Sequence, residues 1–133
     1  MTRRKAMLGG AVLALLGACA PPEPPAPALP LDPRVSMAPD VLLASGSPVV
    51  VPQANGLQRI SLVLANPSAQ DRPVMQRVEW FDAEGQPWPT NLSSPRRMTV
   101  PRFGEAFVTG IAPHARAVSF RIVIERDPLA PGR

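Results

Sequence analysis

The chain has 133 residues, enough for one domain and too few for two, and its 14 basic and 10 acidic side chains give a formal net charge of +4. Three of the basic residues, Arg3, Arg4 and Lys5, stand at the extreme N-terminus, and the remaining balance of 11 to 10 offers no excess for neutralising nucleic-acid phosphates. The single Cys excludes a disulfide framework within the chain, and the single His excludes most metal and catalytic-triad chemistry.

Residues 1–18 have the pattern of a secretory signal peptide. The three N-terminal positive charges are followed by 13 residues, 6–18, that carry no charge. As a helix such a segment spans about 20 Å, whereas the hydrocarbon core of a bilayer is roughly 30 Å thick. It is therefore too short for a transmembrane helix, and we expect it to be absent from the mature protein.

The sequence Leu16-Gly17-Ala18-Cys19 resembles the lipobox of bacterial lipoproteins, in which the cysteine is lipidated and becomes the new N-terminus. The alternative is an ordinary secretory signal, cleaved near Ala18, with an incidental cysteine. On the lipoprotein interpretation Cys19 is a membrane anchor without a free thiol, and two or more acyl chains make the attachment stable. By resemblance to enterobacterial lipoproteins, Ala20 in place of Asp implies the outer membrane, with the domain facing the periplasm.

Residues 19–34 are predicted to be an extended tether. Seven of the 14 residues at positions 20–33 are proline, which lacks the backbone donor that helices and sheets require. Such a segment favours polyproline II and, at about 3.1 Å per residue, would hold the domain roughly 40 Å from the lipid. A ligand for a proline-binding groove is the alternative.

Residues 35–127 form the predicted domain, and residues 128–133 are expected to be a disordered tail. Alternation of apolar and polar side chains predicts half-buried strands at residues 57–64, 74–81 and 117–125. Weaker apolar runs predict further strands at residues 41–44, 49–51, 97–100 and 105–110. About seven short strands separated by turn signals indicate an all-β fold, an antiparallel β-sandwich.

Two strands can be given places in this sandwich. Trp80 alternates with Val78, which favours a core anchor in a central strand over a ligand platform. The run at 49–51 is bracketed by Pro48 and Pro52, an arrangement typical of a sheet edge.

The domain resembles the YcfL family of proteobacterial outer-membrane lipoproteins, which is defined as a domain of unknown function. The specific element is the sequence E-W-F-D-x-x-G at residues 79–85, and matching stretches lie at residues 62–66, 104–105, 111–113 and 118–122. The resemblance implies an immunoglobulin-like sandwich and brings no catalytic residues with it.

Residues suited to catalysis are scarce. His114 has no second His or Cys with which to hold a metal, so we expect a solvated loop residue. Asp82 and Glu84, completed by Glu79 or Glu105, could supply a carboxylate pair for sugar hydrolysis or a calcium contact. The order D-A-E-G after an aromatic strand is more typical of a hairpin turn. We therefore predict a protein that is not an enzyme and needs no metal or cofactor.

The candidate contact residues lie in one long connection. Trp88 stands between prolines, where it could cap the end of the sandwich or project towards a partner or a sugar. Arg96, Arg97 and Arg102 form the one local basic cluster, which is either a solvated face or a contact for lipid A phosphates, peptidoglycan carboxylates or an acidic partner.

Together these features predict an outer-membrane lipoprotein whose domain binds another envelope component, either a protein or peptidoglycan. The alternative is a glycan-binding or lipopolysaccharide-binding module that uses Trp88 and the three arginines.

Overall fold

The computed structural model describes residues 31–131. The predicted signal peptide, Cys19 and most of the predicted tether lie outside the described residues. No helix among the residues described is long and apolar enough to cross a membrane.

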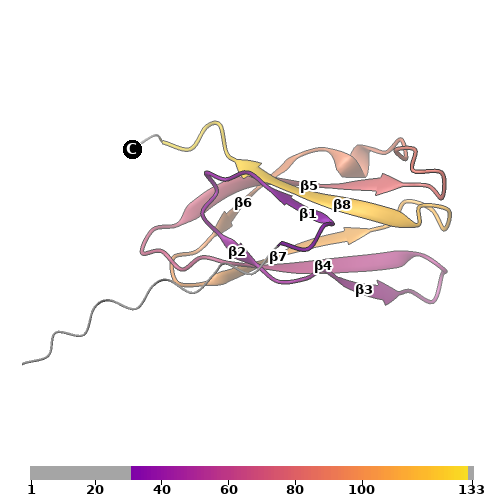
Figure 1. Ribbon diagram of the computed structural model, residues 1–133, viewed down its shortest axis with the longest axis horizontal. Coiled ribbons are helices and arrows are strands. Elements are labelled where there is room, and N and C mark those ends of the chain that lie inside the picture. Colours follow the sequence, from indigo (N-terminus) through magenta and orange to yellow (C-terminus); the bar gives the residue numbers. More distant parts are fainter. Residues whose placement is uncertain (1–30, 132–133) are drawn as a thin grey trace, which may run out of the picture.

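The described part of the chain forms strands and one short 3-10 helix, as Figure 1 shows. The three alternating runs form the long strands β4 (Gln58–Ala65), β5 (Arg72–Phe81) and β8 (Ser119–Arg126). The other elements are β1 (Val35–Met37), β2 (Ala44–Ser45), β3 (Val49–Pro52), η1 (Asn91–Ser93), β6 (Arg96–Val100) and β7 (Glu105–Ile111).

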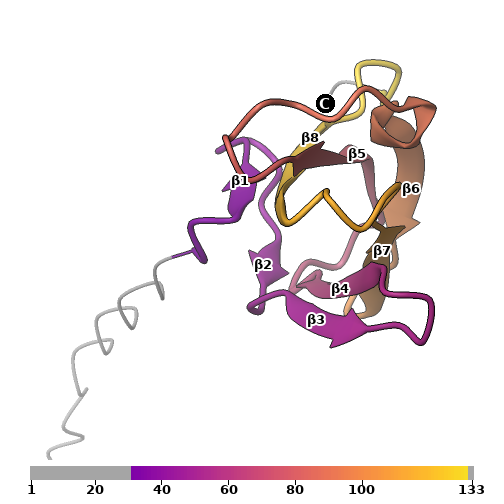
Figure 2. The same ribbon diagram turned by 90° about the vertical axis from the view of Figure 1, so that its right-hand side faces the viewer.

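The strands form two sheets packed face to face, which confirms the predicted β-sandwich (Figures 1 and 2). Sheet A has the strand order β1-β8-β5-β6. In sheet B the central β4 pairs with β2 and β3 along one side and with β7 along the other. The chain passes from β4 in sheet B to β5 and β6 in sheet A, returns in β7 and ends in β8, as in immunoglobulin-like sandwiches.

The core lies between the sheets and is built from the inward-facing positions of the long strands. Trp80 is 1% exposed, and its ring centroid lies 5.6 Å from that of Phe120, so its predicted role as a core anchor is confirmed. The fully buried aliphatic side chains are those of Ile60, Leu62, Leu64, Val74, Val100, Val108, Ile122 and Ile124.

Edge strand β3 pairs only with β4 among the described residues, as its flanking prolines predicted. The strand expected at residues 41–44 is reduced to β2, because Leu42 has a φ of 55° and cannot continue an extended chain. The buried Val41 instead lies in a turn in which its N–H donates to the carbonyl of Ala38.

Strand β1 was not predicted, and its parallel pairing with β8 departs from the otherwise antiparallel sandwich. Just before β1, Asp32 accepts hydrogen bonds at 2.9 and 2.8 Å from the guanidinium of Arg34. These bonds lower the pKa of Asp32 from 3.8 to about 2. Strand β1, the first strand among residues 31–131, is therefore preceded by a turn that an ion pair stabilises.

Candidate functional site

Asp82, one of the carboxylates considered for catalysis, has a structural role. Asp82 Oδ1 accepts hydrogen bonds from the backbone N–H groups of Glu84 and Gln86 at 3.1 and 2.8 Å, and Gly85 follows with a φ of 79°. This is the hairpin turn that the sequence D-A-E-G favoured. Within residues 31–131 there is no group of three or more His, Cys, Asp or Glu side chains that could hold a metal ion.

Trp88 is half-buried at one end of the sandwich. Its backbone N–H donates to the backbone carbonyl of Trp80 at 2.7 Å, and its side chain packs against the core. The ring of His114 stacks on the indole, with 5.1 Å between centroids and an interplanar angle of 11°. One face of Trp88 is thus covered by a residue from the β7–β8 connection. The two residues are distant in sequence, so no local pattern could predict this contact.

The structure does not bring the three candidate arginines together. Paired positions in β5 and β6 show that Arg96 shares the inward face with Val74, whereas Arg97 points outward. Arg102 lies in the turn beyond the far end of β6, and its backbone N–H donates to Asp71 Oδ1 at 2.9 Å. Arg96 lines a cavity of about 560 Å³ together with Trp80.

Arg97 is committed to a carboxylate of its own chain. Its Nε lies 2.6 Å from Asp127 Oδ2, and Nη2 donates to Oδ1 at 3.3 Å. Asp127 is 3% exposed and also accepts the N–H of Leu129 at 2.9 Å. The pair fastens residues 127–131, where the N–H of Ala130 donates to the carbonyl of Asp127, against β6.

The outer face of sheet A is charged. Arg77 contacts Glu79 and Glu125 at 3.0 and 3.2 Å, and Arg121 contacts Glu79 at 2.9 Å. Partial burial alone would raise the pKa of Glu79, but hydrogen bonds from Arg77 and Arg121 outweigh burial and lower it. Such a ladder of paired charges is typical of a surface that stays in contact with water.

The outer face of sheet B carries exposed apolar side chains, a feature that was not predicted from the sequence. Because Ile60, Leu62 and Val108 point into the core, the alternate residues of β3, β4 and β7 point outward. We call this surface the sheet-B face; its most exposed apolar side chains are Val49 (59%), Val51 (47%), Phe107 (61%) and Ile111 (50%).

Charged residues stand only at the two ends of the sheet-B face. Arg59 lies opposite Ile111 at one end, and Glu105 lies opposite Ala65 at the other. Between them the outward positions of β4 and β7 hold Ser61 and Thr109, then Val63 and Phe107. The signal in the sequence was the apolar run of β3 and the apolar residues Phe107 and Ile111 at outward positions of β7, where a solvated outer face favours polar ones.

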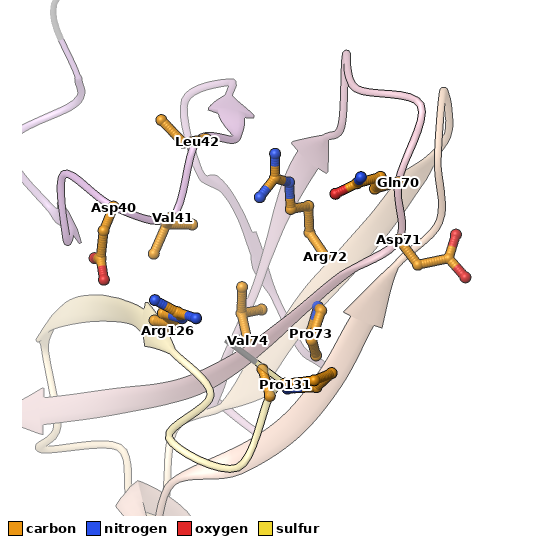
Figure 3. Close-up of a pocket in the computed structure, with 11 residues that line it drawn as sticks. Asp40, Val41, Leu42, Gln70, Asp71, Arg72, Pro73, Val74, Arg126 and Pro131 are labelled. Carbon is orange, nitrogen blue, oxygen red and sulfur yellow. The ribbon is translucent and has the colours of Figure 1, made fainter. Parts of the chain in front are cut away.

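A second unforeseen feature is a cavity of about 500 Å³ at the end of the sandwich where β5 begins and β8 ends, shown in Figure 3. Its floor includes the buried Val41 and Val74, and its walls carry Arg72 and Arg126. We call it the mouth cavity. Arg72 and Arg126 come from strands distant in sequence, so no local pattern could have paired them.

Comparison with solved structures identifies two similar chains. The structure of cj0090 from Campylobacter jejuni is 21% identical, with a TM-score of 0.58, and the match covers 71% of this chain and 98% of that one. A DUF1425 family member from Shewanella sp. pv-4 is 18% identical, with a TM-score of 0.59, and the match covers 67% and 81%. At these identities the likeness shows the fold alone.

No curated protein matches the sequence. The model of the family described as "Protein of unknown function (DUF1425)" matches residues 44–126, which include strands β2 to β8. This stretch exceeds half of the chain, and the chain therefore belongs to the DUF1425 family.

Proposed function

We propose that this protein is a YcfL-like, non-enzymatic lipoprotein of the outer membrane, and that its domain binds another protein of the cell envelope through the sheet-B face. The lipobox at Cys19 and the proline-rich segment that follows support the anchor and the tether. The single observation that carries the binding role is the group of exposed apolar side chains on the sheet-B face, Val49, Val51, Phe107 and Ile111. Exposed apolar side chains that gather on one face and are bordered by polar residues typically mark an interaction site.

The chemistry of the sheet-B face favours a protein over peptidoglycan. Its exposed apolar side chains can contribute van der Waals contacts and the burial of apolar surface; they are those of Val49, Val51, Phe107 and Ile111. Only Arg59 and Glu105, at the two ends of the face, can form charged contacts. A sugar polymer needs many hydrogen-bond partners, whereas the centre of a protein interface is depleted of charge and rimmed by polar groups.

The alternative module for glycans or lipopolysaccharide has less support in the geometry. His114 covers one face of Trp88, Arg97 is paired with Asp127, and Arg102 lies at the other end of β6. A module that used Trp88 and the three arginines together would need an open indole face with the guanidinium groups beside it.

Site-specific photocrosslinking in intact cells tests the binding role. Lys5 is the only lysine, so amine-reactive crosslinkers do not report on the domain. A photoreactive residue at Phe107 is expected to capture one discrete envelope protein. The same residue at Ser119, exposed on the outer face of sheet A, is the matched control. Equal capture from both positions, or none from Phe107, would contradict the proposal.

A second variant separates binding from folding. Phe107 is 61% exposed, so Phe107→Asp is expected to leave the midpoint of urea unfolding nearly unchanged. It should reduce capture from a photoreactive residue at Val51 by about tenfold or more, because an unpaired carboxylate would be buried in the interface. Undiminished capture would show that the partner lies elsewhere.

The anchor is tested separately. Cys19→Ser is expected to abolish incorporation of labelled fatty acid and to move the protein from the membrane fraction to the soluble periplasmic fraction. Unfolding of the domain should be unchanged, since residues 31–131 form the sandwich. Continued lipid labelling of the variant would refute the anchor.

A further inference from the structure

The inward-facing rows of sheet A end in arginines at the mouth cavity. Val74, Val78 and Trp80 of β5 are buried, and Arg72 continues their face. On β8 the buried Ile122 and Ile124 are followed on the same face by Arg126, which pairs with Val74. Paired positions and alternate positions lie on the same side of a sheet. The side chains of Arg72 and Arg126 therefore both start from the inner side of sheet A, at the open end of the sandwich.

The two arginines are diagonal neighbours. Arg126 lies opposite Val74, and Arg72 is two residues further along the same strand, a spacing that separates such positions by about 7–8 Å. Figure 3 shows both side chains beside the turn that carries Val41 and Leu42. Two forked donor groups at this spacing can converge on one anion.

Neither guanidinium is paired with a carboxylate within residues 31–131. The outward arginines of sheet A, in contrast, are all paired: Arg77 with Glu79, Arg97 with Asp127, and Arg121 with Glu79. Arg72 Nε donates to Ser68 Oγ at 3.3 Å, a neutral contact that orients the side chain without neutralising its charge. Within the described residues the two arginines thus form no ion pair, and the neighbouring inward positions Val74 and Val100 are apolar.

The rest of the mouth cavity is largely apolar. Val41 and Val74 are buried in its floor, and Pro73 and Pro131 line its sides. Leu42 stands at the rim, 59% exposed, with a φ of 55°. Leucine adopts this left-handed conformation only at an energetic cost, which the surrounding turn must offset. The result is an exposed apolar side chain held beside two cations.

Two aspartates also line the mouth cavity. Asp71 accepts the backbone N–H of Arg102, and its carboxylate points away from the arginines in Figure 3. Asp40 is exposed on the wall opposite β5 and carries the one negative charge that faces the cavity. The two arginines outweigh it.

We propose that the mouth cavity binds an amphipathic anion, in which a carboxylate or phosphate group carries an apolar chain. Arg72 and Arg126 would hold the head group, because guanidinium forks match both kinds of anion. Leu42, Val41 and Val74 would contact the chain. A volume of about 500 Å³ falls within the range of small-molecule sites.

Calorimetric titration tests the proposal on the full chain with the substitution Cys19→Ser, which removes the residue predicted to carry the covalent lipid. The probes are octanoate and octyl phosphate, with octyl glucoside as the neutral ligand of equal chain length and inorganic phosphate as the head group alone. At least one octyl anion should bind about tenfold or more tightly than octyl glucoside and inorganic phosphate, and the stronger one identifies the head group.

Variants locate the site. Arg72→Gln and Arg126→Gln are each expected to weaken binding of the octyl anion by about tenfold. Asp40→Asn should strengthen it by a few fold, because one repulsive charge is removed. Arg116→Gln removes another exposed arginine, from the β7–β8 connection outside the mouth cavity, and should change nothing. If the Arg72 variant fails to fold, Arg126→Gln, at the exposed end of β8, still shows whether the mouth cavity is the binding site.

Three results would overturn the proposal: no binding of either octyl anion, equal binding of octyl glucoside, or equal weakening by Arg116→Gln. The outcome is independent of the proposed binding role, because the mouth cavity and the sheet-B face use different residues. Phe107→Asp should leave the affinity for the octyl anion unchanged.

Discussion

Replacing Arg97 by glutamine removes the charged partner of a buried carboxylate. Asp127 is 3% exposed; it accepts a hydrogen bond from Arg97 Nη2 at 3.3 Å, and its Oδ2 lies 2.6 Å from Arg97 Nε in an ion pair. In the variant only the N–H of Leu129 remains to stabilise the negative charge. The folded state therefore loses a contact that the unfolded chain does not have.

The size of this loss follows from the exposure of the two partners. A hydrogen bond to a charged group contributes about 1.5–3 kcal/mol, and removing one partner leaves the other unsatisfied. The side chain of Arg97 is 52% exposed, so water screens part of the interaction. We expect a decrease of about 2 kcal/mol in the free energy of unfolding, which lowers the melting temperature of a domain this size by roughly 10 °C.

Thermal unfolding followed by circular dichroism measures the effect, and Arg96 supplies a matched control. Arg96→Gln removes the same charge one residue away on the other face of β6, and the expected change is within about 0.5 kcal/mol. Asp127→Asn in the Arg97→Gln background should recover part of the loss, because a neutral amide needs no counter-charge. Equal losses at Arg96 and Arg97, or no recovery, would refute the reasoning.

Three further predictions concern the turns and the close contact between the sheets. Asn66→Ala should lower the free energy of unfolding by about 2–4 kcal/mol in urea titrations, because the buried amide makes four hydrogen bonds. Gly110→Val should cost about 1–3 kcal/mol by the same assay, since a Cβ there would already lie 3.3 Å from a core side chain; Gly46→Ala, with open space around it, is the control. Because the pKa of Asp32 falls from 3.8 to about 2, its carboxylate stabilises the fold above the upper value, and this contribution is lost as the pH falls towards the lower one. Melting temperatures should therefore fall more steeply between about pH 4 and pH 2 for the wild type than for Asp32→Asn.

Alternation identified the strands that are buried on one face. β4 and β8 place a series of apolar residues towards the core, and β5 does so with Val74, Val78 and Trp80 although Gln76 interrupts the row, so a period of two is visible in the sequence. β1 has three residues, too few to display a period, and its parallel partner β8 is more than 80 positions later in the sequence, although the two strands are neighbours in sheet A. Such a short strand forms only because a partner strand supplies its hydrogen bonds, and the local sequence does not show which strand that is.

The surfaces were harder to predict than the strands. Arg96 and Arg97 are neighbours in sequence, but successive residues of a strand point to opposite faces, so their charges belong to different surfaces. The partner of Arg97 is 30 residues away, and the mouth cavity joins the start of β5 to the end of β8. These contacts depend on the strand order, which the sequence pattern alone does not specify.

The parallel pairing of β1 with β8 also constrains when the domain can fold. The register joins Val35 to Ile122, so the first strand of the domain has no place in sheet A until the last strand has been made. A chain that is synthesised, or passes through a membrane pore, N-terminus first must keep β1 unpaired until nearly all of its length has emerged. Closing so long a loop is slow compared with forming the β4–β7 or β5–β6 pairs. Completion of sheet A is therefore a late step, and truncation near the C-terminus should release the N-terminal strand as well.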